Sequence, residues 1–542
     1  MCALHSPLQL VRGSECATEH CGHIVSISPI RPLKKNQPHV AISPTAERCL
    51  SCPFRSFSMQ SDPDSRSPPQ YKDELPFNRA VGPQGLLSRK RFVLVAWTAL
   101  VIISLGCLAT FMGYTSIPSE ITTEPLDVLG GHSSAVSLPP PTASVDPLAP
   151  TSVLKGGPTL SFRDNLRPDV QYITSWVSAG WTNDVMTYIN LIYLGLITER
   201  VPIIPEFIPS HIGGHVPPIP FGEVFDVPRL RQLLGQPVLE WREVKHHNST
   251  FVDDLGCWNV WEAVQYREAY PRRSRIPDDL NLDISYTRAP DWIKMIPNFE
   301  HDQHVTFWSL ARLAFPTTRK ASLVTPLPSK KHGVSLPPDE HLLCYDYVYY
   351  VSAHQPFEME YDYSPAWRYV GKYMHWTPRL QQLADEYVRR ALGVPEDGTI
   401  PPYISMHVRH HDFEVWCGGL PVSECFAPLP VIARRVREVQ EELYETTGTR
   451  VNHVIMTSDE RNATWWREVS ELGWFSPDHT DTVALYGDWY PVLIDAVIQS
   501  SGVGFVGTDR STMSIVAARR VESWQKGPNR LVKWGTPDAD DH

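Results

Sequence analysis

Beyond Pro401, apolar segments of strand length alternate with longer segments whose apolar residues recur every three or four positions. We expect strands at 403–408, 453–457 and 503–506, and helices at 429–446, 463–472, 490–500 and after Ser511. Strand and helix units repeated in this order predict a parallel sheet with helices over both of its faces. The alternation therefore constrains this part of the chain to an α/β fold.

A similar unit stands earlier in the sequence. An alternating apolar segment at 170–177 ends in a turn that contains Gly180, a helix follows to about Thr198, and an apolar strand spans 201–207. Strand, turn, helix and strand make up a βαβ unit. This unit predicts a second α/β region in the first part of the folded chain.

Residues 245–350 show little periodicity, apart from a strand-like segment around 344–351. Clear order returns at a helix that begins at Thr377-Pro378 and ends before Gly393. Two α/β regions separated by a less regular stretch predict two Rossmann-like lobes that face a cleft, at 169–392 and 393–542.

The segment at 92–114 carries no charged residue and, at about 1.5 Å rise per residue, is long enough to cross a hydrocarbon core. We expect a transmembrane helix with the basic cluster at 89–91 on the cytoplasmic side, which makes a type II anchor. Residues 1–91 are rich in Ser, Pro and Arg and predict a disordered cytoplasmic tail. Residues 115–168 are rich in Pro, Ser and Thr and predict an extended stem. This organisation is typical of a protein of the Golgi or ER membrane whose body is lumenal.

Cysteines and glycosylation sequons agree with a lumenal body. The sequons are Asn248-Ser249-Thr250 and Asn462-Ala463-Thr464. The cysteines after the apolar segment are Cys257, Cys344, Cys417 and Cys425. They permit two disulfides in three pairings, and a bond between Cys417 and Cys425 would close a short loop.

The formal net charge of −11 argues against a nucleic-acid partner, because binding to the phosphate backbone needs a basic face. An acidic chain can still contain a local pocket for an anion. Such a pocket would be formed by individual polar clusters at strand ends.

The segment HVRHHDF at 407–413 follows the strand expected at 403–408. The two-residue period of a strand places His407 and Arg409 on the same side, and Asp412 falls in the loop beyond. An arginine presents a planar fork to two phosphate oxygens, which suits a departing diphosphate.

The histidines of this segment leave a metal site open as an alternative. Imidazole nitrogens and carboxylates are common zinc ligands. The candidate ligands are His407, His410, His411 and Asp412. A metal-dependent lumenal hydrolase is therefore an alternative function, although Arg409 would place a fixed cation beside the metal.

Two further polar clusters follow the next strands. The strand that ends at Thr457 leads to Asp459, which can accept hydrogen bonds from a nucleoside or cap the next helix. The strand that ends at Val506 leads to Ser511 and Thr512 at the start of a helix. Their hydroxyls and the N–H groups of the helix N-terminus would attract a phosphate. The alternative is that Ser511 is an ordinary N-cap. Since ligands of open α/β sheets bind at the carboxyl ends of strands, we expect these clusters to meet.

Four stretches resemble, in order, the GDP-fucose protein O-fucosyltransferase superfamily, and in particular its membrane-anchored fungal-type members. They are a Gly-x-x-Asn turn at 180–183, an HxR motif at 407–409, TSDE at 457–460 and FVGTxxST at 505–512. The resemblance spans about 170–525 and implies a GT-B fold. It also implies an inverting glycosyltransferase that needs no metal or other cofactor and transfers fucose from GDP-fucose to a hydroxyl of a protein or glycan.

By this resemblance, Arg409 binds the β-phosphate and stabilises the departing GDP, while Asp459 lies near the nucleoside. The matched residues of the substrate site are Gly180, Asn183, His407, Arg409, Asp412, Asp459, Ser511 and Thr512. A sugar-nucleotide or glycan-binding protein without catalysis remains a further alternative.

The sequence departs from the superfamily at the general base. Some members carry a glutamate in the first-lobe turn, where this chain has Ala179. The proton of the acceptor hydroxyl still needs a destination. Asp184, Glu206 and a mechanism without a base remain open, with Asp184 as the candidate base.

Overall fold

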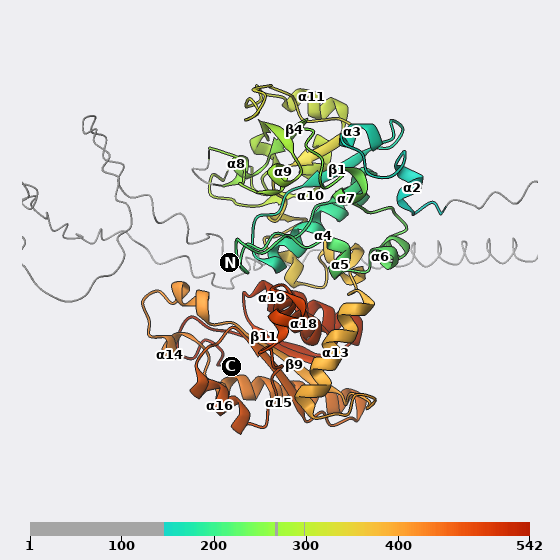
Figure 1. Ribbon diagram of the computed structural model, residues 1–542. Coiled ribbons are helices and arrows are strands. Elements are labelled where there is room, and N and C mark those ends of the chain that lie inside the picture. The colour runs from blue at the N-terminus through green and yellow to red at the C-terminus, as the bar shows by residue number, and fades with distance from the viewer. Residues whose placement is uncertain (1–145, 266–268, 298, 542) are drawn as a thin grey trace, which may run out of the picture. The chain divides into compact units, whose positions relative to one another are not determined.

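The computed structural model describes residues 146–265, 269–297 and 299–541, and these form two lobes, each built on a parallel sheet (Figure 1). The predicted cytoplasmic tail, the apolar segment at 92–114 and most of the predicted stem lie outside the described residues. Within the described ranges, no helix combines the length and the apolar character that a membrane crossing requires.

The first lobe contains a six-stranded sheet in the order β3-β2-β1-β7-β4-β5, in which all pairs are parallel. Its strands are β1 Tyr172–Ser175, β2 Val201–Ile204, β3 Leu239–Glu240, β4 Asp253–Asn259, β5 Leu282–Arg288 and β7 Leu342–Tyr345. Helix α4 (Trp181–Thr198) connects β1 to β2, which confirms the βαβ unit predicted from the sequence. Nearly all of α4 is buried, so it carries apolar residues on every side.

The stretch at 245–350, which shows little periodicity, supplies β4, β5 and β7. These strands are buried on both faces, and therefore lack the alternation of a half-exposed strand. A disulfide between Cys257 and Cys344 joins β4 to β7. The strand-like segment expected at 344–351 is divided in the structure, because β8 (Val351–Ser352) leaves the sheet and pairs with β6 (Val305–Thr306).

Short helices cover the first lobe. They are α2 Pro150–Val153, α3 Phe162–Asn165, α5 Phe221–Val224, α6 Val227–Leu234, α7 Trp241–Val244, α8 Trp261–Val264, α9 Ile276–Asp279, α10 Phe307–Leu313, α11 Pro316–Ser322 and α12 Pro365–Tyr369. The stem expected to reach residue 168 ends before α2, because Phe162 is fully buried in the core and Ser161 donates a hydrogen bond to Asp253 of β4.

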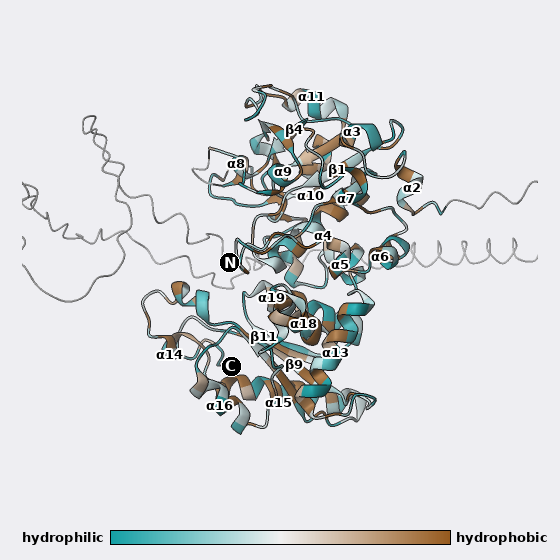
Figure 2. Ribbon diagram, in the orientation of Figure 1, coloured by the Kyte–Doolittle hydropathy of each residue, from teal (hydrophilic) through white to brown (hydrophobic). Residues whose placement is uncertain are grey.

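The second lobe contains a four-stranded parallel sheet in the order β10-β9-β11-β12. Its strands are β9 Tyr403–Val408, β10 His453–Ser458, β11 Gly504–Thr508 and β12 Asn529–Val532. Its helices are α13 Pro378–Leu392, α14 Val422–Cys425, α15 Leu429–Thr447, α16 Ala463–Glu471, α17 Thr482–Tyr486, α18 Tyr490–Ser501 and α19 Thr512–Arg520. The strands and helices expected after Pro401 are all present, and apolar residues gather along the sheet (Figure 2).

Helix α13 lies in the second lobe, although the sequence analysis assigned it to the first. It packs against α18 and β10, and Gln381 on α13 donates a hydrogen bond to Ser501 at the end of α18. The boundary between the lobes therefore precedes α13.

The order of strands reverses between β9 and β11 in the second sheet and between β1 and β7 in the first. Open α/β sheets bind ligands beyond the carboxyl ends of the strands at such a reversal.

Candidate functional site at the cleft between the lobes

A cavity of about 830 Å³ lies beyond the carboxyl ends of β1 and β7 in the first lobe and of β9 and β11 in the second. Its lining includes every residue predicted for the substrate site. These residues are Gly180, Asn183, His407, Arg409, Asp412, Asp459, Ser511 and Thr512. The sequence clusters therefore do meet in one place.

Arg409 follows β9 and is fixed from both neighbouring strands. Its N–H donates to Oγ1 of Thr508 at the end of β11, at 2.9 Å. Its guanidinium lies 2.8 Å from Oδ1 of Asp412 and 3.1 Å from Oδ2 of Asp459. Both contacts are ion pairs that hold the guanidinium at the cavity wall. A guanidinium has five N–H donors, so two neighbouring carboxylates leave donors for an anion in the cavity.

Asp459 does not cap a helix. Its Oδ1 accepts the N–H of His410 at 2.9 Å, while the N-cap of α16 is Asn462, whose side chain accepts the N–H of Thr464. The capping role considered for Asp459 is therefore wrong. The carboxylate instead orients Arg409 at the cavity wall.

His407 is buried on β9 and holds a neutral imidazole at this wall. Burial lowers its pKa to about 3, and the nearby charge of Arg409 acts in the same direction. Its Nδ1 lies 2.8 Å from Oγ of Ser514, which also accepts the N–H of Thr508 at 3.0 Å. When the Ser514 hydroxyl donates to Nδ1, the imidazole carries its proton on Nε2 and can donate it to a ligand.

A tight turn connects β11 to α19. A Cβ atom at Gly507 would lie 2.5 Å from the ring of Phe505 and 2.7 Å from Cβ of Ser514, so glycine lets the helix pack closely on the strand. Ser511 occupies the N-cap position but makes no capping hydrogen bond through its side chain. Ordinary N-capping is therefore not its role, and the hydroxyl lines the cavity.

Helices α4 and α19 contact each other, and residues of the first turn of each helix line the cavity. Thr512 on α19 donates a hydrogen bond to Oδ1 of Asn183 at 2.7 Å, and its Oγ1 lies 2.8 Å from that of Thr182 on α4. Each helix N-terminus carries a positive partial charge and unpaired N–H groups. The two helices and Arg409 together make this part of the cavity a site for an anion.

The remainder of the first-lobe wall was not found from the sequence. It includes His211, Arg272, Tyr347, Tyr349 and Tyr350. The tyrosines directly follow β7, and this aromatic segment was recognised only as strand-like. His211 and Arg272 lie in loops that carry no motif.

Arg272 is held rigidly beside the turn that follows β1. Its guanidinium lies over the rings of Trp261, at 4.6 Å, and Tyr347, at 5.4 Å, and donates to the carbonyl oxygen of Ser178 at 2.9 Å. It adds a fixed positive charge on the first-lobe side.

Asp184, the candidate base, has no access to the cavity. It is fully buried in the first turn of α4, and its Oδ1 accepts the N–H of Ala179 at 3.1 Å. Burial raises its pKa well above the ordinary value. Glu206 does not line the cavity either. Asp184 therefore shapes the turn, and the expectation that it removes a proton from a substrate is corrected.

The metal site proposed for 407–412 does not form. Nδ1 of His410 lies 2.8 Å from Oε2 of Glu460, and its ring packs against Phe426 and Trp465, whereas His407 is engaged by Ser514. His407 and His410 thus have separate partners. The candidate ligands do not belong to any group of possible ligands close enough to share an ion within the described ranges.

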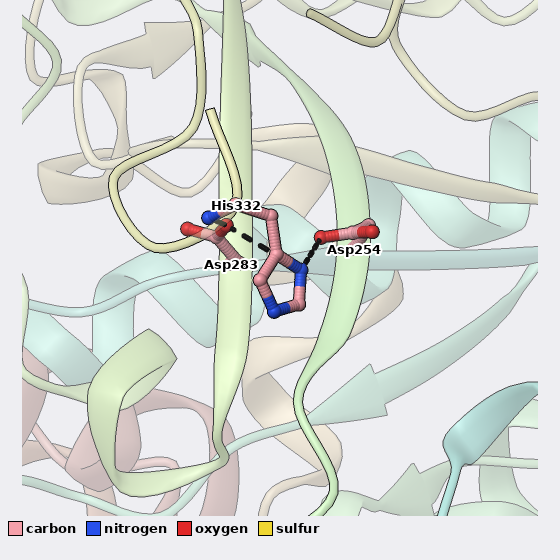
Figure 3. Close-up of side chains that lie close together, drawn as sticks. All are labelled: Asp254, Asp283 and His332. Atoms are coloured by element: carbon pink, nitrogen blue, oxygen red, sulfur yellow. Dashed lines mark hydrogen bonds and ion pairs between the residues drawn. The ribbon is translucent and has the colours of Figure 1, made fainter. Parts of the chain in front are cut away.

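One such group does occur elsewhere among the described residues, formed by Asp254, Asp283 and His332 (Figure 3). Nδ1 of His332 lies 2.8 Å from Oδ1 of Asp254, and Asp283 accepts the backbone N–H groups of Lys331 and His332. These contacts fasten the loop at 329–334 to the amino ends of β4 and β5. The group lies at the opposite end of the sheet from the cavity.

Both disulfides allowed by the cysteine count are present, between Cys257 and Cys344 and between Cys417 and Cys425. The second closes the short loop expected from the sequence. Just before it, Trp416 at the cavity wall is about half exposed. The disulfide limits the freedom of the loop that holds this ring.

No family model and no curated protein matches the chain. Among solved structures, the chain is similar to POFUT1 in complex with GDP-fucose, at 15% identity and a TM-score of 0.41 over 67% of this chain and 98% of that one. It is also similar to fucosyltransferase NodZ from Bradyrhizobium, at 14% identity and a TM-score of 0.33 over 64% and 92% of the two chains. Similarity at this level does not decide the function, which we infer from the cleft.

Proposed function

We propose that the protein is a glycosyltransferase that takes fucose from GDP-fucose and transfers it to a hydroxyl of a protein or glycan. One observation carries the proposal: Arg409 and the N-termini of α19 and α4 converge on one cavity, at the strand reversals of two facing α/β lobes. The choice of GDP-fucose rests on the four sequence motifs.

The chemistry assigned to the site is the departure of GDP. Negative charge develops on the β-phosphate as the bond to the sugar breaks, and pre-oriented donors stabilise such charge most strongly. The guanidinium of Arg409, the Nε2–H of His407 and the start of α19 with Ser511 supply these donors. In this proposal fixed protein charges stabilise the departing diphosphate, which a metal ion does in other transferases.

The course of the reaction is proposed to be inverting. The diphosphate is assigned to the second lobe, and the acceptor enters from the first-lobe wall that contains the tyrosines after β7. An acceptor oxygen on that side attacks the sugar carbon from the face opposite to the leaving group. Attack from the opposite face inverts the configuration.

A setting in the secretory pathway, on a Golgi or ER membrane, belongs to the same proposal. Both disulfides suit an oxidising compartment. The asparagines of the two sequons, Asn248 and Asn462, are exposed and accessible to glycosylation.

The test measures turnover of GDP-fucose by the purified full-length protein in EDTA, as GDP release and as sugar transfer to an acceptor panel. We expect turnover in EDTA and a loss of about 100-fold or more in Arg409→Ala, the order found when a transition-state donor is removed. Arg467→Ala, an exposed substitution on α16, is the matched control.

Three results contradict the proposal. Turnover that survives in Arg409→Ala removes the assigned role of this residue. Turnover that requires an added divalent ion removes metal independence. Binding of GDP without release or transfer identifies a binding protein instead of an enzyme.

A further inference from the structure

We propose that His211 is the base that receives the proton of the acceptor hydroxyl. This inference rests on the transferase function proposed above. His211 would take the role that the sequence predicted for Asp184.

His211 lies in the loop between β2 and α5 and reaches the cavity from the first lobe. Its ring packs against Gly180 at the start of α4, where a Cβ atom would lie 3.6 Å from both Nε2 and Cδ2. The side chain is exposed within the cavity, and neither ring nitrogen hydrogen-bonds to another described residue. Both nitrogens therefore remain available to a substrate.

The other groups of the cavity that could accept a proton already interact with protein partners or lie in the second lobe, where the nucleotide sugar is assigned. Asp412 and Asp459 are paired with Arg409, and His407 is engaged by Ser514 and is too weakly basic. His411 lies in the second lobe, beside the assigned diphosphate site.

Among the residues of the first-lobe wall, His211 is the one that can act as the base. The side chains there that can gain or lose a proton are His211, Arg272, Tyr347, Tyr349 and Tyr350. Arginine stays charged and phenols keep their protons at neutral pH, so neither can accept one. An imidazole is the group in this set with a free lone pair. The acceptor enters from this wall, so the base belongs on it.

The charges around His211 keep it neutral and ready to accept a proton. Enclosure in the cleft lowers its pKa, the cation of Arg409 after β9 adds to this effect, and the carboxylate of Asp412 opposes it. The N-terminus of α4, against which the ring packs, carries a positive partial charge that also favours the neutral form.

The acceptor oxygen forms a bond to the anomeric carbon of fucose, and the bond from that carbon to the β-phosphate oxygen breaks. The electron pair of the broken bond leaves with GDP, beside Arg409. The hydroxyl proton moves to a ring nitrogen of His211, which later releases it to solvent through the open cavity.

The test compares the full-length protein with His211→Gln and His211→Asn, which place an amide near Nε2 and Nδ1. We expect kcat for transfer to fall by about 100-fold to 10,000-fold, the range of general-base catalysis. The decline of kcat at acidic pH that His211 causes in the wild type should disappear, while the affinity for GDP stays unchanged. His215→Gln is the control, because His215 is exposed in the same loop and lies outside the cavity lining.

The outcomes separate this inference from the proposed function. If the wild type transfers fucose and His211→Gln keeps kcat within threefold with the same pH profile, the role of His211 is refuted and the transferase stands. A lower affinity for GDP with unchanged kcat also refutes it, since that result indicates a structural role. If the wild type shows no transfer with any acceptor, the proposed function and this inference both fall.

Discussion

Replacing Ser514 with alanine tests how the floor of the cavity is held together. The hydroxyl of Ser514 connects Nδ1 of His407, at 2.8 Å, with the N–H of Thr508, at 3.0 Å, and all three groups are buried. Alanine leaves two buried polar groups without partners, and each such group costs about 1–3 kcal/mol. The higher helix propensity of alanine returns about 0.5 kcal/mol. We therefore expect a net loss of about 1.5–5.5 kcal/mol in the free energy of unfolding.

The measurement is urea unfolding at pH 7, followed by tryptophan fluorescence, with and without GDP. Ser470→Ala on α16 is the matched control, because its hydroxyl is exposed and bonds only to the preceding helical turn. Its effect should stay within about 0.5 kcal/mol. In Ser514→Ala, binding of GDP should also weaken. Without the Ser514 hydroxyl, nothing fixes the tautomer of His407 that carries the proton on Nε2. A loss of stability no larger than that of the control refutes this account of the His407 tautomer.

Three other expectations concern stability. Lys245→Ala should lower the free energy of unfolding by about 3–5 kcal/mol in urea. The ion pair between Lys245 and Asp253, at 2.7 Å, is buried, and the substitution leaves the carboxylate without an ion-pair partner. An effect below about 1 kcal/mol contradicts this expectation. Removing the Cys257–Cys344 disulfide should cost about 4–5 kcal/mol and removing Cys417–Cys425 about 2–3, because the closed loops differ in length; the reverse order of melting temperatures contradicts it. Burial lowers the pKa of His407 to about 3 from 6.5, so the unfolded chain takes up its proton first and stability falls as pH drops from about 6.5 towards 3. His407→Gln should flatten that part of the curve, and an unchanged slope speaks against it.

The second lobe was predictable because its signals are local. β9 has the bounds expected from the sequence, and α15 and α18 each differ from the expected bounds by one residue. Proline or glycine residues mark the ends of these elements, and each element has a clear apolar pattern. The first-lobe sheet was predictable only at β1 and β2. The strands β4, β5 and β7 are buried on both faces, and β7 is inserted between β1 and β4, which lie far from it in the sequence. That order depends on tertiary packing, which local periodicity does not contain.

The residues of the site also divide into those with a local sequence signal and those placed by tertiary packing. Clusters that directly follow strands, such as those at Arg409 and Ser511, were predicted because the carboxyl ends of parallel strands share one edge of a sheet. His211 and Arg272 come from loops whose positions are set by long-range packing. Asp184 was misassigned because α4 is buried on nearly every side. Asn183 in its first turn lines the cavity, whereas Asp184, the next residue, is fully buried.

The central claim is that Arg409 and the two helix N-termini bind the diphosphate of a guanine nucleotide. Isothermal titration of the full-length protein with GDP and with UDP, in EDTA, tests it most directly. We expect saturable binding of GDP that is tighter than that of UDP. The affinity for GDP should fall by about 30-fold to 1,000-fold in Arg409→Ala, which corresponds to about 2–4 kcal/mol for charged hydrogen bonds to phosphate. Equal affinity for GDP in Arg409→Ala and the wild type would contradict the account.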